Sequence, residues 1–294
     1  MNFFSLFFPI IIYGILFGLN YALISIGFTL VFGVSKILNL SYGALYMTTA
    51  YMIYYFAVMN NLPLVISIIF SIILTIAIGL GIFYTILKFT INPMIFMVTM
   101  LLFALLLQYI YSYLFGGQVG LIIPSLFSNI SISIFGVSVN LSLLSSSIIS
   151  VFLLFIVSFW IYKTSFGRKI RATAEDPEIA ELIGINTKQI ILIVLSVSIL
   201  LVSIASILLV PMQEVTPTMW VDPFVIAFAV SIIGGLGKFE WAIPAAFIVS
   251  FAEVISQYLI PYNVSDIVAF IIVILFIIIF PNGIGGAKVE SWIS

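Results

Sequence analysis

The sequence predicts an all-α fold, a polytopic bundle of about eight to ten transmembrane helices within a single domain covering residues 1–294. Of these residues, 64% are hydrophobic and only 6% are charged, whereas a soluble domain carries about 25% charged residues. Inside lipid, only helices and closed barrels satisfy their own backbone hydrogen bonds. The apolar stretches run on for about 20 residues without the alternation that a barrel strand requires, so helices are predicted.

Separate apolar segments are expected to form these helices. The first segment is longer than a single crossing needs and the seventh is short, so the number of spans stays between about eight and ten. The seventh segment is expected to be tilted, broken or re-entrant. In chain order, the segments are 6–34, 37–59, 62–87, 93–115, 141–162, 190–211, 224–236, 242–260 and 264–281.

The positions of the basic residues predict the orientation, because loops rich in Lys and Arg stay in the cytoplasm. Five of the nine basic residues lie between Lys163 and Lys188. Counting spans outward from this loop places the other four on the same side, namely Lys36, Lys88, Lys238 and Lys288. The N-terminus is therefore expected outside and the C-terminus in the cytoplasm. The loops 116–140 and 212–223 are expected outside, and the first of them is expected to hold a short helix or strand.

Several classes of function are disfavoured by the composition. The chain has no Cys and no His, so neither catalytic residues nor a metal site are expected. A P-loop is also missing, because Phe239 follows Lys238 where a phosphate-binding loop needs Ser or Thr. We therefore expect no bound cofactor and no enzyme with its own ATP site. The net charge of −1 gives no reason to expect nucleic acid as a partner.

The loop 163–189 is the one strongly charged stretch, and it contains a short helix with recognisable ends. Asp176 is a good N-cap, Pro177 suits the first helical position and Gly184 is placed to end the helix. Ile179, Leu182 and Ile183 share one face by their spacing. Something must cover this apolar face, either the neighbouring spans or a groove on a partner protein.

This loop resembles the cytoplasmic coupling loop of the branched-chain amino acid ABC transporter permeases of the LivH type. The resemblance rests on Gly167, Arg171, Ala172, Ala174, Ala180, Gly184 and Ile185. The stretch from Gly18 to Gly43, the run GGLGK, Glu253 and the run FPNGIGG match the same family in the same order. This chain has Ser41 and Tyr42 where the family often has Ala and His, and Lys238 and Trp241 where it often has Ser and Gly.

The resemblance implies a permease subunit of an ABC importer in the plasma membrane, moving branched-chain or related amino acids by alternating access. It implies a second, similar permease subunit, two cytoplasmic ATP-binding subunits that use the ATP, and an extracytoplasmic substrate-binding protein. Residues of the coupling loop would transmit motion from the ATPases. These candidates are Gly167, Arg168, Arg171, Ala172, Ala174, Glu175, Asp176, Ala180 and Gly184.

Polar side chains and glycines inside the apolar segments are candidates for the translocation pathway, because such residues face protein or water rather than lipid. Each has an alternative role in structure, as a hydrogen bond between helices or a tight turn. Glu253 is the one carboxylate well inside a segment, and Gln257 lies one turn further on. The candidates are Asn20, Asn39, Ser41, Tyr42, Gly43, Gly234, Gly235, Gly237, Glu253 and Gln257.

Two other classes of function compete with the importer subunit. A stand-alone secondary transporter or channel for small polar solutes, such as amides or urea, would need ion sites within the membrane, and the chain offers Glu253 and little else. A membrane enzyme would need a nucleophile, base or metal in one site. The sequence does not identify the solute.

Overall fold

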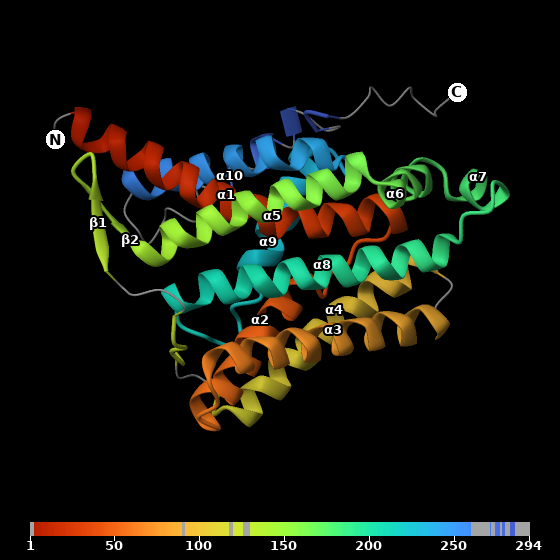
Figure 1. Ribbon diagram of the computed structural model, residues 1–294, viewed down its shortest axis with the longest axis horizontal. Coiled ribbons are helices and arrows are strands. Elements are labelled where there is room, and N and C mark those ends of the chain that lie inside the picture. Colours follow the sequence, from red (N-terminus) through yellow and green to blue (C-terminus); the bar gives the residue numbers. More distant parts are fainter. Residues whose placement is uncertain are drawn as a thin grey trace.

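The computed structural model describes residues 3–89, 92–117, 120–125, 130–259, 271, 274–276, 278–279 and 283–285. Its described residues form a bundle of long helices with one small hairpin (Figure 1). The elements are α1 (Phe3–Ser35), α2 (Tyr42–Ile53), α3 (Leu64–Phe89), α4 (Pro93–Leu114), β1 (Ser131–Ile134), β2 (Val137–Asn140), α5 (Leu141–Lys163), α6 (Ser165–Glu175), α7 (Pro177–Leu182), α8 (Thr187–Leu209), α9 (Val221–Gly234) and α10 (Phe239–Leu259).

The predicted helical bundle is confirmed. Within the part of the chain that the structure describes, six helices are long and apolar enough to cross a membrane, namely α1, α3, α4, α5, α8 and α10. The predicted segment 37–59 corresponds to α2 and a π-helical turn, Tyr54–Met59, and the short segment 224–236 corresponds to the 14-residue α9. The predicted last span, 264–281, lies largely outside the described residues.

Helices α1, α2 and α9 form the interior. Helix α1 packs against α10 along most of its length and also contacts α5, α8 and α9. All but one residue of α2 are buried. Helices α3 and α4 lie along one side of the bundle and expose many large apolar side chains, as expected of surfaces that face lipid (Figure 1). The interior is therefore made by the long first span together with two short helices of 12 and 14 residues.

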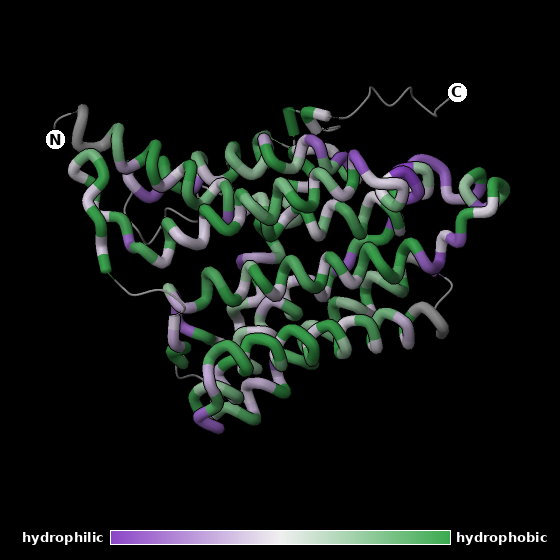
Figure 2. The backbone as a smooth tube through the Cα atoms, viewed as in Figure 1, coloured by the Kyte–Doolittle hydropathy of each residue, from purple (hydrophilic) through white to green (hydrophobic). Residues whose placement is uncertain are grey.

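Hydrophilic residues gather at one end of the bundle, where α6 and α7 lie (Figure 2). The Lys36 ammonium at the end of α1 donates a hydrogen bond to the carbonyl of Ala174 on α6. Burial and the nearby Lys238 ammonium lower the pKa of Lys36, so these two basic residues also share this end. The clustering agrees with the predicted charge asymmetry, while which end faces the cytoplasm stays a prediction. Lys288 lies outside the described residues.

A β-hairpin occupies the opposite end of the bundle and accounts for part of the loop 116–140. Strands β1 and β2 pair antiparallel, and the turn between them uses Phe135 and Gly136 at φ angles of 50° and 80°. Val137 and Val139 are buried, whereas Ser138 on the same strand is exposed. The alternation of serine with aliphatic residues therefore gives one apolar and one polar face. Of the short helix or strand expected in this loop, the described residues form the strand.

Candidate functional site

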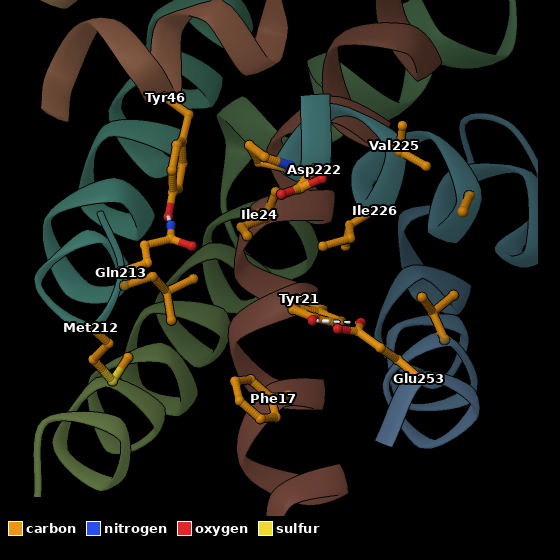
Figure 3. Close-up of a pocket in the computed structure, with 14 residues that line it drawn as sticks. Phe17, Tyr21, Ile24, Tyr46, Met212, Gln213, Asp222, Val225, Ile226 and Glu253 are labelled. Carbon is orange, nitrogen blue, oxygen red and sulfur yellow. Dashed lines mark hydrogen bonds between the residues drawn. The ribbon is translucent and has the colours of Figure 1, made fainter. Parts of the chain in front are cut away.

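A cavity of about 390 Å³ lies between α1, α2, α8, α9 and α10 (Figure 3). The residues along α1 and α10 that face it recur at helical spacing, as Phe17, Tyr21 and Ile24 on α1 show. Its walls are mainly apolar, which is typical of sites for small molecules. The lining residues are Phe17, Tyr21, Ile24, Tyr46, Leu209, Met212, Gln213, Asp222, Pro223, Val225, Ile226, Ala229, Val249 and Glu253.

A small number of polar groups from four helices and one loop meet in this cavity (Figure 3). The Tyr21 hydroxyl donates to Glu253 Oε2 at 2.6 Å, and Gln257 Nε2 donates to Glu253 Oε1 at 3.2 Å. On the facing wall, Gln213 Nε2 donates to the Tyr46 hydroxyl at 3.2 Å. These bonds join α1 to α10 and the end of α8 to α2, so the polar groups are held in place on both sides of the cavity.

The residues that line the cavity differ in exposure. Asp222 and Gln213 are exposed, whereas Tyr21 is 8% exposed and Glu253 is half-buried. Asp222 lies in the first turn of α9, where a negative charge complements the helix dipole. A two-residue backbone pairing supports the loop before α9, because Leu121 and Val215 exchange hydrogen bonds of 3.1 and 2.8 Å. The exposed part of the lining thus includes a carboxylate, and ordered backbone holds the loop before α9.

Of the pathway candidates, Glu253 lines the cavity, and Gln257 contacts Glu253 from the next turn of α10. Asn20 lies instead between α1 and α5, where it bonds to the Leu16 carbonyl at 2.8 Å and to Ser147 and Ser150 at 3.0 Å. These contacts match the structural alternative for Asn20, a hydrogen bond between helices.

The candidates from Asn39 to Gly43 build the start of α2. Asn39 Oδ1 accepts hydrogen bonds from the Ser41 amide at 3.1 Å and the Ser41 hydroxyl at 2.7 Å. Because of this turn, α2 begins at Tyr42, whereas the predicted segment begins at residue 37. The Tyr42 hydroxyl then donates to the Ile24 carbonyl at 2.7 Å. A side chain at Gly43 would clash with the Trp220 carbonyl oxygen, so glycine allows α2 to approach the start of α9.

Gly234, Gly235 and Gly237 lie at the turn between α9 and α10, at the end of the bundle that carries α6. Gly235 and Gly237 have φ angles of 98° and 80°, which glycine adopts without strain. The Ile284 and Gly285 amides donate to the carbonyls of Ile233 and Gly234 at 2.7 and 3.2 Å. The turn is therefore hydrogen-bonded to a distant part of the chain, and the local sequence does not predict this contact.

Among the residues that sequence reasoning missed, Tyr21, Tyr46, Gln213 and Asp222 line the cavity. Asp222 carries a weak signal, since it is a charged residue at the start of a short apolar segment. The two tyrosines and the glutamine resemble ordinary residues of the membrane boundary. Their common location follows from how the helices pack.

The coupling-loop candidates on α6 form a compact corner against the end of α5. Thr164 caps α6 by accepting a hydrogen bond from the Gly167 amide at 3.0 Å, and a side chain at Gly167 would clash with the Ile161 carbonyl. The Arg171 guanidinium donates to that carbonyl and lies 5.6 Å from the centre of the Tyr162 ring. Arg171 and Gly167 thus set the angle at which α6 leaves the bundle.

The remaining candidates on α6 differ in exposure. Arg168 and Glu175 are exposed, whereas Ala172 and Ala174 are half-buried. The Ala174 carbonyl accepts the hydrogen bond from Lys36 described above. Helix α6 is therefore attached to α1 as well as to α5, with a charged outer surface.

Helix α7 has the ends that the sequence predicts. Asp176 accepts hydrogen bonds from the amides of Glu178 and Ile179 at 2.9 and 3.0 Å. Gly184 has a φ of 86°, and the amides of Gly184 and Ile185 bond back to Glu181 and Ala180, as in a Schellman motif.

The apolar face of α7 is exposed at the outer tip of the bundle (Figure 1). Ile179, Leu182 and Ile183 are 58%, 86% and 69% exposed, and among the described residues no span covers them. Ala180 alone is buried, because it points back to the bundle. The sequence left two candidates to cover this apolar face, the neighbouring spans or a partner protein. Since no described span covers it, a partner protein is the candidate that remains compatible with the described residues.

Residues 10–277 match the family described as branched-chain amino acid transport system / permease component. The chain belongs to this family. The match covers most of the sequence, so the cavity and both α6 and α7 lie inside it. Together with the apolar helices, membership makes the chain a multi-pass protein of the plasma membrane.

Curated relatives of this permease family align along nearly the whole chain. The high-affinity branched-chain amino acid transport system permease protein LivH of Salmonella typhimurium is 27% identical over 299 residues, covering 95% of each chain. LivH of Escherichia coli and BraD of Pseudomonas aeruginosa are also 27% identical, again with 95% of each chain covered. No solved structure matches the chain.

Proposed function

We propose that the chain is a membrane subunit of an ABC importer that carries branched-chain or related amino acids. Family membership and the printed names of the relatives support this class of transporter. The proposal includes a second homologous permease subunit, two cytoplasmic ATP-binding subunits and an extracytoplasmic binding protein. ATP would be used by the partner subunits, since the chain has no P-loop of its own.

The observation that carries the proposal is that one helix, α1, lines the cavity along its middle and contacts α6 at its end. Helix α1 lines the cavity through Phe17, Tyr21 and Ile24, and its end contacts α6 through Lys36. The exposed apolar face of α7 adjoins α6. A force applied to α6 and α7 therefore has a direct route to the cavity wall.

The proposed mechanism is alternating access. ATP binding draws the two nucleotide-binding subunits together, and each subunit carries the α6–α7 corner of one permease with it. Helix α1 moves with α6, because Lys36 and the α5 corner hold the three helices together. The cavity would then close on the side of the hairpin and open toward α6. Under the predicted orientation this direction of transport is inward.

The test is uptake of radiolabelled leucine into proteoliposomes that contain the complete complex and the binding protein. ATP enclosed with the nucleotide-binding subunits is expected to drive accumulation. Mutation of the ATPase P-loop lysine should abolish accumulation while leaving the complex intact. Leucine flux driven by an ion gradient through the chain alone would contradict the proposal and support the stand-alone transporter.

A further inference from the structure

An exposed apolar strip runs along β1 and the tip of the β-hairpin. It consists of Ile130, Ile132 and Phe135, which are 60%, 43% and 80% exposed, and we call it the hairpin strip. Ile132 pairs with Val139, so both lie on the apolar face of the hairpin. On that face Val137 and Val139 of β2 are buried against the bundle. The side chains of β1 extend beyond this contact and need another apolar surrounding.

The tip of the hairpin holds a bulky residue in an unfavourable backbone conformation. Phe135 and Gly136 have φ angles of 50° and 80°. Asn or Asp followed by Gly is the usual pair in a turn of this kind, and a positive φ is rare for a bulky residue. The Phe135 ring stacks on Phe8 with centroids 5.6 Å apart, yet most of its surface stays exposed. Water is a poor surrounding for that surface, so an apolar one would offset the cost of the turn.

The contacts of the hairpin with α1 indicate its level in the membrane. Phe135 stacks on Phe8, and the Tyr13 hydroxyl donates to the Ser138 carbonyl at 2.8 Å, beside the start of α1 (Figure 1). The apolar span of α1 has 29 residues, or about 43 Å, whereas the hydrocarbon core measures about 30 Å. A span of this length reaches into the headgroup region at its ends. The hairpin beside its first turns therefore lies at headgroup level.

The surroundings of the strip favour lipid over a protein as its cover. The loop 116–140 contains no charged residue, whereas protein interfaces have a polar rim around their apolar centre. Asn140 ends the hairpin and caps α5. Helix α5 exposes large apolar side chains such as Ile148 and Phe152, each 62% exposed, as lipid-facing helices do. The strip thus leads along the chain into a surface that faces acyl chains.

We infer that the hairpin lies in the headgroup layer of the bilayer, with Phe135 and Ile132 directed toward the acyl chains and its serine face toward water. Ser133 and Ser138 pair across that face and are both exposed. The partner of the strip is a phospholipid surface, into which apolar side chains of interfacial segments reach by about 5–10 Å. Such an anchor fixes the starts of α1 and α5 at one boundary of the membrane. The inference goes beyond the proposed function and does not depend on it, because its test does not measure transport.

Site-directed spin labels test the depth of the hairpin, since the natural chain contains no cysteine. Phe135→Cys and Ile132→Cys place a nitroxide on the strip, and Ser133→Cys places it on the serine face as the matched control. Each labelled full chain is reconstituted in vesicles of phosphatidylethanolamine and phosphatidylglycerol. Relaxation of the nitroxide is then measured with oxygen, which partitions into lipid, and with a water-soluble nickel chelate.

We expect the ratio of the oxygen effect to the nickel effect to be several-fold higher at positions 132 and 135 than at position 133. Similar ratios at the three positions would overturn the inference. If nickel dominates at all three, the strip lies in water and an extracytoplasmic protein becomes the favoured cover. If Phe135→Cys does not fold, the comparison of Ile132→Cys with Ser133→Cys still decides the question.

A further pair of variants separates insertion of the ring from the geometry of the turn. Asparagine adopts a positive φ more readily than phenylalanine, so Phe135→Asn should keep the hairpin folded. Combined with the label at Ile132→Cys, it should lower the oxygen-to-nickel ratio several-fold, because the ring no longer holds the tip in lipid. Phe135→Trp keeps a large aromatic ring and should leave the ratio unchanged. An unchanged ratio in Phe135→Asn would contradict the role given to Phe135.

Discussion

Gly43 and Gly81 both lie inside helices, but their surroundings differ. A Cβ atom at Gly43 would clash with the backbone carbonyl of Trp220, which cannot move without shifting α9. A Cβ atom at Gly81 on α3 would meet nothing within 4 Å. Glycine at position 43 is therefore required by the close approach of two helices, whereas at position 81 it is not.

Gly43→Ala is expected to destabilise the protein by about 1–3 kcal/mol or more, because the added methyl group forces α2 away from α9. Gly81→Ala should raise stability slightly, by up to about 1 kcal/mol, because alanine favours an exposed helix. Thermal unfolding of the two purified variants, followed by tryptophan fluorescence, measures both effects. Similar midpoints for the two variants would show that the approach of α2 to α9 is not tight.

At the scale of single elements, α7 has clear helix-capping residues at both ends and an exposed apolar face. Asp176 and Gly184 define a helix of six residues, which is too short to be stable alone. Its corner is held by Ala180, which is buried, and by a hydrogen bond from Thr187 to Glu181. The apolar side chains are thus presented on a fixed support, as a docking surface requires.

Leu182→Glu should weaken association with the ATP-binding subunits by at least about tenfold, since burial of one leucine contributes about 1.5–3 kcal/mol. Leu182 is 86% exposed, so the fold of the permease should not change. Co-purification of the subunits from detergent measures the effect. Gln189→Glu adds the same charge at an exposed position nearby and serves as the control. Equal recovery of ATPase with both variants would argue against docking on α7.

For the whole molecule, the two ends of the bundle have different characters. One end carries α6, α7 and the hydrophilic residues of the loop 163–189, whereas the other carries the hairpin (Figure 2). The positive end is predicted to face the cytoplasm. The same orientation places the hairpin outside the cell.

This orientation can be tested directly, because the chain contains no cysteine. Ser133→Cys on the hairpin should react with a membrane-impermeant maleimide in intact cells. Glu178→Cys on α7 should react only after the cells are permeabilised. The natural sequence supplies the unlabelled control. Labelling of Glu178→Cys in intact cells, with Ser133→Cys protected, would reverse the orientation and the proposed direction of transport.

The sequence by itself determined the membrane class, the positions of the helices and the ends of α7. These features depend on interactions within a few residues of one another or on the exchange of water for lipid. Apolar length defines a span, and Asp176 and Gly184 bond to neighbouring backbone. Glu253 was also accessible to this reasoning, because a carboxylate within an apolar segment is conspicuous.

Only the tertiary structure decided which residues share the cavity. Tyr21 and Glu253 are separated by 232 residues, and they meet because α1 packs along α10. Asn20, adjacent to Tyr21, turns instead toward α5, since neighbouring residues on a helix point about 100° apart. Local sequence cannot distinguish these two directions when every face of the helix is apolar. The packing of the other helices around α1 makes that choice, and it brings Tyr21 and Glu253 together at the cavity.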